Sequence, residues 1–167
     1  MQTSNVKPVR VGLVGYGWWG KIIAKQISNS NILKLIAVVE VDQSLLPQMQ
    51  SDVELSGVKV LSNYEEFLKI SEMEAVILCT PHLQHADQII NAAHAGKHVF
   101  CEKPLCLTLS DAQRAIKSCA QHKLVLGIGH ERRFEPSVIS LRREIQEGVF
   151  GEILQIEANF SQDKFFA

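Results

Sequence analysis

Three closely spaced glycines near the amino terminus are the first residues that suggest chemistry. They occur in the segment Gly15-Tyr16-Gly17-Trp18-Trp19-Gly20. In such a turn the first glycine permits a tight bend, the second lets the backbone approach a pyrophosphate, and the third lets a helix pack closely on a strand. The pyrophosphate then lies at the amino terminus of that helix. The segment predicts a dinucleotide site formed by all six residues, and a glycine loop of another α/β protein is the alternative.

An acidic residue at a suitable distance narrows the ligand. Glu40 closes the apolar run 35–39, where a carboxylate would accept hydrogen bonds from the adenosine ribose hydroxyls. The next residues, Val41, Asp42 and Gln43, include no arginine or lysine that could hold a 2′-phosphate. A second anion about 4 Å from Glu40 would cost on the order of 1 to 4 kcal/mol. We therefore predict NAD as the cofactor, in preference to NADP.

Two further turns follow apolar runs of strand length. Thr80-Pro81, with His85 close behind, follows residues 75–79, and Glu102-Lys103-Pro104 follows residues 99–101. In an open α/β sheet the ligand crevice lies at the carboxyl ends of the strands. Both turns should therefore converge beside the nicotinamide half of the dinucleotide. A third turn, 130–134, carries Arg133 and would add a cation to the same edge.

Lys103 is the candidate for proton exchange with a substrate hydroxyl. A lysine in a partly desolvated crevice releases its proton more readily than one in water, which suits acid–base work. The carboxylate of Glu102 beside it would favour the charged form instead. From spacing alone, an ordinary surface lysine in a turn is the more frequent case.

Histidines and cysteines gather in the middle of the chain, which raises the question of a metal. They are Cys79, His82, His85, His94, His98 and Cys101. A zinc site requires four ligands that converge tetrahedrally. His94 is expected roughly 13 Å along its helix from His85 at 1.5 Å per residue. We therefore predict no metal site.

Apolar runs alternate with helical patterns over the first 129 residues. The runs cover residues 11–14, 35–39, 58–61, 75–79, 99–101 and 124–128. Continuous apolar strands indicate burial on both faces, and apolar residues recur at helical spacing over 19–27, 86–93 and 112–119. Gly96 suits a helix end, and Thr108 with Asp111 suits a helix start. The fold class predicted is α/β, a Rossmann-type doubly wound parallel sheet. Trp19 should be core, and Trp18 is placed either at the cofactor or in solvent.

The pattern changes after Gly129. Glu135-Pro136 opens a helix that Gly148 closes, and residues 152–160 read as a strand with one apolar face. We expect an NAD(P)-binding domain over 1–129 and, over 130–167, the first helix and strand of an incomplete α+β domain for substrate binding and oligomerisation. The strand could pair with another copy to form a homo-oligomer. A non-catalytic dinucleotide-binding or protein-interaction module is therefore the alternative function.

Composition argues against several classes of protein. The 167 residues carry a net charge of -1 and are 46% hydrophobic, and the scattered lysines and arginines indicate no nucleic-acid or membrane partner. The polar amino terminus lacks a signal-peptide stretch, and the apolar runs are too short to span a bilayer, so we expect a cytoplasmic protein. The four cysteines are expected to be free thiols.

Several motifs together resemble the Gfo/Idh/MocA oxidoreductases. They are the glycine turn, Thr80-Pro81 with His85, Ala95-Gly96-Lys97-His98-Val99, Glu102-Lys103-Pro104, Arg133-Phe134-Glu135-Pro136 and Gly148-Val149-Phe150-Gly151-Glu152. Their order and spacing cover nearly the whole chain. The context of His85 and Arg133-Phe134 argues against a relative of glucose-6-phosphate dehydrogenase, a further alternative.

The resemblance implies hydride transfer between C4 of the nicotinamide and a hydroxyl-bearing carbon of a sugar or cyclitol. Lys103 is then similar to the lysine that contacts the nicotinamide ribose and the substrate hydroxyl, which reverses the reading from spacing. Other residues are similar to those that bind the ribose or line the cofactor: Glu40, Thr80, Pro81, His85 and Glu102. Family members also carry a second domain with an aspartate and a histidine four residues apart, for which this chain shows no counterpart. We expect NAD binding and poor turnover by this chain alone.

Overall fold

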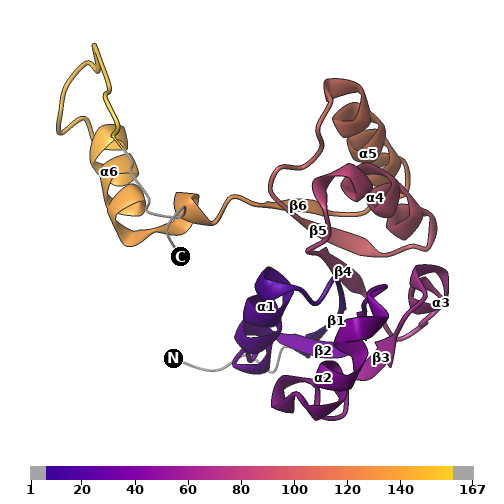
Figure 1. The fold of residues 1–167 in the computed structure, drawn as a ribbon. Helices are drawn as coiled ribbons and strands as arrows, with labels where there is room; N and C mark the ends of the chain where they lie inside the picture. Colours follow the sequence, from indigo (N-terminus) through magenta and orange to yellow (C-terminus); the bar gives the residue numbers. More distant parts are fainter. Residues whose placement is uncertain (1–6, 160–167) are drawn as a thin grey trace. The chain divides into compact units, whose positions relative to one another are not determined.

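The computed structural model describes residues 7–159, and its contacts divide the chain into one unit ending at Gly129 and another beginning at His130. The strands of the first unit (Figure 1) are β1 (Val9–Val14), β2 (Leu33–Val39), β3 (Lys59–Leu61), β4 (Ala75–Leu78), β5 (His98–Glu102) and β6 (Leu126–Gly129). Its α-helices are α1 (Trp18–Ser28), α2 (Leu46–Ser51), α3 (Tyr64–Leu68), α4 (His85–His94) and α5 (Leu109–Gln121).

The strands form one sheet in the order β3-β2-β1-β4-β5-β6, and every neighbouring pair is parallel. The chain builds outward from β1 to β3 and then returns to start β4 on the other side of β1. In sheets of this kind ligands bind outside the carboxyl ends of the strands, at the point where the order reverses. That point lies between β1 and β4, directly after which come the glycine turn and Thr80.

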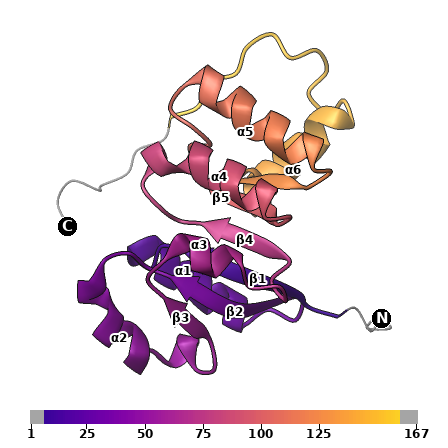
Figure 2. The ribbon, with the colours of Figure 1, turned by 90° about the vertical axis from the view of Figure 1, so that its right-hand side faces the viewer.

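Each face of the sheet is covered by its own apolar layer. Leu13 and Ile77 pack with residues of α1, α2 and the loop before β3, such as Ile27 and Met49. Side chains from the same strands that point the other way pack with residues of α3, α4 and α5, and Figure 2 shows α4 and α5 side by side. Burial of both faces explains why these strands read as continuous apolar runs. The predicted α/β fold class is confirmed.

The helix boundaries follow local chemistry. Thr108 caps α5, accepting a hydrogen bond from the backbone N–H of Asp111 at 3.1 Å and donating to its carboxylate. Gly96, directly after the end of α4, has a φ of 71°, a left-handed conformation that glycine adopts without steric cost. Both helix boundaries were predicted from the sequence and are confirmed.

The second unit contains one α-helix in its described part, α6 (Pro136–Gln146), preceded by a 3₁₀ turn over Glu131–Phe134. The helix agrees with the prediction, but the strand predicted over 152–160 is wrong over 152–159, which form no strand. Phe160 lies outside the described residues. An isolated strand has no ladder partner for its backbone groups, and the apolar side chains of Leu154 and Ile156 are 88% and 71% exposed. Pairing of this segment with another copy of the chain stays a prediction.

Over residues 7–159 we find no helix with the length and apolar character that crossing a bilayer requires. The same residues contain no group of three or more histidine, cysteine, aspartate or glutamate side chains arranged to hold a metal ion.

Candidate functional site

The glycine turn bends where β1 meets α1, and two of its glycines are needed for packing within the protein. Gly15 has a φ of 90°, and a Cβ there would lie 2.8 Å from the backbone oxygen of Cys79. A Cβ on Gly20 would overlap the carbonyl oxygen of Gly15. At both positions a neighbouring backbone oxygen leaves no room for a Cβ. The first and third glycines of the turn are therefore explained by packing within the protein.

Gly17 is different, because packing within residues 7–159 does not require a glycine there. A Cβ added there has no neighbour within 4 Å, and its φ of -67° suits any residue. Gly17 is exposed and stands as the N-cap of α1. An open space at this backbone position fits a ligand group that would be displaced by a side chain.

The amino terminus of α1 is prepared for an anion. No described side chain caps it, and its first turn holds no acidic residue. The first backbone N–H groups of a helix lack intrahelical acceptors and carry the positive end of the helix dipole. Together with the open space at Gly17, this arrangement fits a pyrophosphate lying on the helix terminus.

Glu40 lies beside the turn, directly after β2. Its carboxylate accepts hydrogen bonds from the backbone N–H of Tyr16 at 2.7 Å and of Asp42 at 3.0 Å, and the residue is only 9% exposed. A carboxylate offers about four acceptor positions, so two remain for the vicinal hydroxyls of a ribose. The two backbone bonds hold the carboxylate between the glycine turn and the segment after β2.

Asp42 adds a second negative charge to this edge. The hydroxyl and the backbone N–H of Ser44 both donate to its carboxylate, at 2.6 and 2.9 Å, and hold the pKa of Asp42 below its usual range. Asp42 therefore stays ionised at neutral pH. From the sequence, Asp42 is identifiable only as a residue that cannot hold a 2′-phosphate, and its fixed negative charge depends on the contact with Ser44.

A pocket of about 290 Å³ connects these features. It is lined by Val14, Gly15, Gly17, Val39, Glu40, Val41, Asp42, Leu45, Tyr64, Cys79, Thr80, Pro81, Gln84 and Gln88. Among the residues predicted to bind the cofactor, it brings together Gly15, Gly17, Glu40, Thr80 and Pro81. The predicted crevice at the carboxyl ends of the strands is therefore present.

The three aromatic residues of the glycine turn, Tyr16, Trp18 and Trp19, do not line this pocket. The Tyr16 side chain is fully buried, and its hydroxyl donates to Asp52 at 2.8 Å, so its ring points into the protein. Trp18 is 76% exposed. Trp19 is half-buried rather than fully core, with its ring 5.5 Å from that of Trp18.

Two glutamines in the pocket wall, Gln84 and Gln88, were not predicted from the sequence. The hydroxyl of Thr80 donates to Oε1 of Gln88, whose Nε2 donates to Oε1 of Gln84 at 3.0 Å. The hydroxyl of Tyr64 donates to the backbone oxygen of Gln88 at 2.8 Å. Gln84 lies in the turn between β4 and α4 and Gln88 in the first part of α4, and no sequence motif marks them.

The turn after β5 holds one buried and one exposed charge. Glu102 is 9% exposed, and its carboxylate accepts from the backbone N–H of Lys103 at 3.3 Å. A Cβ on Gly129, its register partner in β6, would lie 2.7 Å from Oε1 of Glu102, so that glycine makes room for the carboxylate. Lys103 is exposed. Neither residue lines the pocket of about 290 Å³.

His85, for which the family resemblance implies a cofactor-lining role, lies behind the pocket wall, and that role stays a prediction. It is the first residue of α4, fully buried, and absent from the pocket wall. Arg133 lies in the second unit, exposed, in the 3₁₀ turn before α6. Its predicted place at the same edge as Lys103 stays a prediction.

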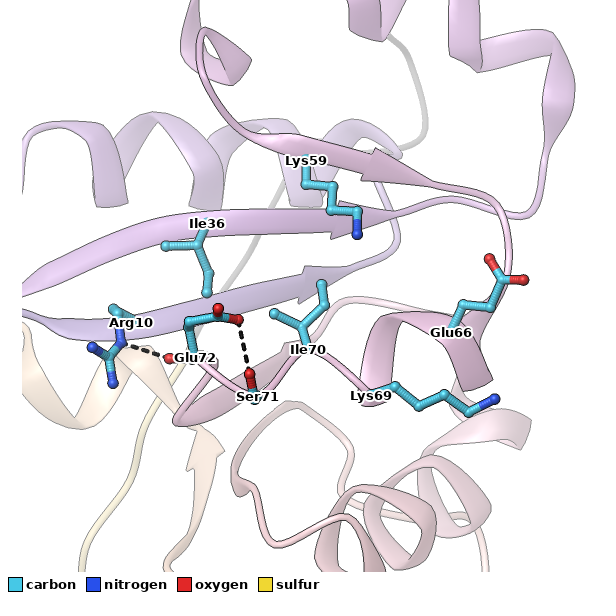
Figure 3. A pocket seen from close by; sticks show the side chains of 8 residues that line it. All are labelled: Arg10, Ile36, Lys59, Glu66, Lys69, Ile70, Ser71 and Glu72. Carbon is cyan, nitrogen blue, oxygen red and sulfur yellow. Dashed lines mark hydrogen bonds between the residues drawn. The ribbon is translucent and has the colours of Figure 1, made fainter.

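A larger open pocket of about 680 Å³ lies at the opposite ends of the strands (Figure 3). It is lined by Arg10, Ile36, Lys59, Glu66, Lys69, Ile70, Ser71 and Glu72. Arg10 and Lys59 stand at the amino ends of β1 and β3, and Arg10 is already bonded to the backbone oxygen of Glu72. No long helix begins at this pocket, so size alone does not make it the better dinucleotide site.

The fold and the carboxyl-end pocket define a dinucleotide-binding Rossmann domain. Residues 9–130 match the GFO_IDH_MocA family, described as "Oxidoreductase family, NAD-binding Rossmann fold". The chain belongs to this oxidoreductase family, and the resemblance noted in the sequence is confirmed.

Individual relatives show how much of a family member the chain represents. It is 32% identical over 145 residues to inositol 2-dehydrogenase of Rhizobium meliloti (strain 1021), covering 87% of this chain and 43% of the relative. It is 29% identical over 165 residues to D-xylose 1-dehydrogenase [NADP(+)] of Haloarcula marismortui, covering 96% of this chain and 45% of the relative. The chain thus spans less than half the length of these relatives.

A solved structure agrees with the fold and the cofactor. Scyllo-inositol dehydrogenase from Lactobacillus casei, with bound NAD(H) and scyllo-inositol, superposes with a TM-score of 0.78 at 30% identity. The match covers 87% of this chain and 43% of that one.

Proposed function

We propose that this chain binds NAD in the pocket between the glycine turn and the turn after β4. The pyrophosphate lies over Gly17 on the amino terminus of α1, and the adenosine ribose donates its hydroxyls to Glu40. The observation that carries this placement is Gly17, whose side-chain space is open while the helix terminus beside it has no cap among the described residues.

The charges around the ribose favour NAD over NADP. A 2′-phosphate would lie beside Glu40 and Asp42, and the pocket wall includes no lysine or arginine. Each carboxylate about 4 Å from the phosphate would oppose binding by on the order of 1 to 4 kcal/mol. The named NADP enzyme of Haloarcula shows that relatives differ in this preference, so the choice here rests on the residues of this chain.

The reaction proposed is the oxidation of a CH–OH group in a sugar or cyclitol, for which the NAD supplies the hydride acceptor. Its support is the family and the named inositol and xylose dehydrogenases. Lys103 follows β5 at the carboxyl edge of the sheet, and we assign it to the nicotinamide ribose and the substrate hydroxyl. Because the chain spans less than half the length of those relatives, we propose for the chain itself only the cofactor-binding part of this activity.

Isothermal titration calorimetry tests the binding part. Wild-type protein should bind NAD, and NADP should bind at least about tenfold more weakly. Gly17→Val should abolish NAD binding while leaving the protein folded, because a Cβ at this position has no neighbour within 4 Å among the described residues. Lys59→Ala, in the pocket at the other end of the sheet, serves as the control and should bind NAD normally. Absence of NAD binding by the wild type, or unchanged binding by Gly17→Val, would overturn the proposal.

A further inference from the structure

His85 occupies a position that its surroundings define closely. Its ring is fully buried at the start of α4, between the turn after β4 and the turn after β5. Nε2 lies 3.0 Å from the backbone oxygen of Thr80, and Nδ1 lies 2.9 Å from the backbone oxygen of Pro104. One side chain therefore bridges the turn after β4, which lines the pocket of about 290 Å³, and the turn after β5.

Both partners of the His85 ring are carbonyl oxygens, which only accept hydrogen bonds, so the protonation of the ring determines how many of them receive one. A neutral imidazole carries one N–H and donates to one carbonyl at a time, whereas a doubly protonated ring donates to both. In either state a ring nitrogen faces each turn. Buried hydrogen bonds of this kind leave an unsatisfied carbonyl when the donor is removed.

Under the proposed function the two turns serve different halves of the dinucleotide, in contrast to the expectation from the sequence that both lie beside the nicotinamide. Thr80 and Pro81 line the pocket that holds the adenosine and pyrophosphate, and Pro104 directly follows Lys103, which is assigned to the nicotinamide. The two turns are also connected through their strands, because β4 and β5 pair in the sheet and end just before the turns.

We propose that His85 is a positioning residue that holds the Lys103–Pro104 turn at a set distance from the Thr80–Pro81 turn. It touches no cofactor itself. Through Pro104 it places Lys103 beside the nicotinamide once the adenosine half is bound. This inference rests on the proposed function and adds a role for a residue behind the pocket wall.

The affinities for two ligands, ADP-ribose and NADH, distinguish this positioning role from a general contribution of His85 to the fold. ADP-ribose lacks the nicotinamide, whereas NADH carries it and reports its environment by fluorescence. For His85→Gln, whose single amide reaches one turn, the Kd for ADP-ribose should stay within about twofold of wild type. The Kd for NADH should rise about tenfold, and the fluorescence gain of bound NADH should fall. His82→Gln, the same change in an exposed neighbour whose ring lies 5.6 Å away, should leave both ligands unaffected.

Equal losses for both ligands, or no loss for either, would overturn the inference. If the wild type binds neither ligand, the proposed function itself fails, so the two failures are distinguishable. Because His85→Gln removes a buried hydrogen bond and could prevent folding, nuclear magnetic resonance of the wild-type chain supplies a second test. The ring N–H of His85 should exchange slowly with water, and NADH should slow that exchange further while ADP-ribose should not. Exchange as fast as at His82, or the same response to both ligands, would contradict the proposal.

Discussion

At the scale of single residues, Glu40 is where packing and ligand chemistry meet. Its carboxylate is bonded to the backbone N–H groups of Tyr16 and Asp42, so the same group that would receive the ribose also fixes the glycine turn against the segment after β2. The ribose therefore meets a carboxylate whose position is already set, which lowers the ordering cost of binding.

The cysteines give a residue-scale prediction that does not depend on the cofactor. Burial, with a smaller contribution from the carboxylate of Glu102, raises the pKa of Cys79 to about 12, and burial raises that of Cys101 to about 12. At pH 8 only about 10⁻⁴ of each thiol is the reactive thiolate. Native protein should react with Ellman's reagent at these two positions far more slowly than protein denatured in guanidinium chloride. Rapid native labelling of Cys79 or Cys101, located by peptide mapping, would refute this.

The residues of the site were predictable where type and spacing carry the chemistry. Glycines on a strand-to-helix turn and an acid after the next strand identify Gly17 and Glu40 without a structure. Gln84 and Gln88 were not predictable, because their role depends on a hydrogen-bonded relay from Thr80 that only the folded turn creates. For His85, the family resemblance implied a cofactor-lining role, but a motif does not say which way a side chain points, and the ring is buried between two turns.

At the scale of elements, Lys97 ties the loop before β4 to the end of α4. Its Nζ donates to the backbone oxygens of Ile70 and Met73, each at 2.8 Å, and the residue is 7% exposed. Lys97→Met should lower the free energy of unfolding by about 1–3 kcal/mol, because it leaves two carbonyls without their donor. Urea denaturation measures this change.

The matched control for that experiment is Lys69→Met, since Lys69 is exposed at the end of α3. An exposed substitution should change stability by no more than about 0.5 kcal/mol. Equal urea midpoints for the two variants would show that the buried hydrogen bonds of Lys97 do not stabilise the loop.

The helices and strands were largely predictable, because a sheet buried on both faces requires strands that are continuous apolar runs in the sequence. Apolar runs marked every strand of the sheet to within about two or three residues, and Thr108 and Gly96 marked helix boundaries. The expected strand over 152–160 failed for a physical reason: alternation indicates which face would be covered, but a strand also needs a neighbour, and residues 152–159 have none in the described chain.

At the scale of the whole molecule, the two ends of the sheet offer competing places for a charged ligand. The carboxyl end combines an uncapped helix terminus with Glu40, and the amino end gathers Arg10, Lys59 and Lys69 around a larger opening. Both pockets lie in the unit that ends at Gly129. Which end receives the dinucleotide is therefore a question about this unit alone.

Mapping the NAD-induced shifts of backbone amide signals in the ¹⁵N-labelled chain answers that question most directly. The shifts should be largest at Gly15–Gly20, at Glu40–Asp42 and at Thr80 and Gln84, with signals of Arg10, Lys59 and Lys69 unmoved. Shifts gathered around Arg10, Lys59 and Lys69 instead, or no shifts at NAD concentrations that saturate related dehydrogenases, would contradict the account.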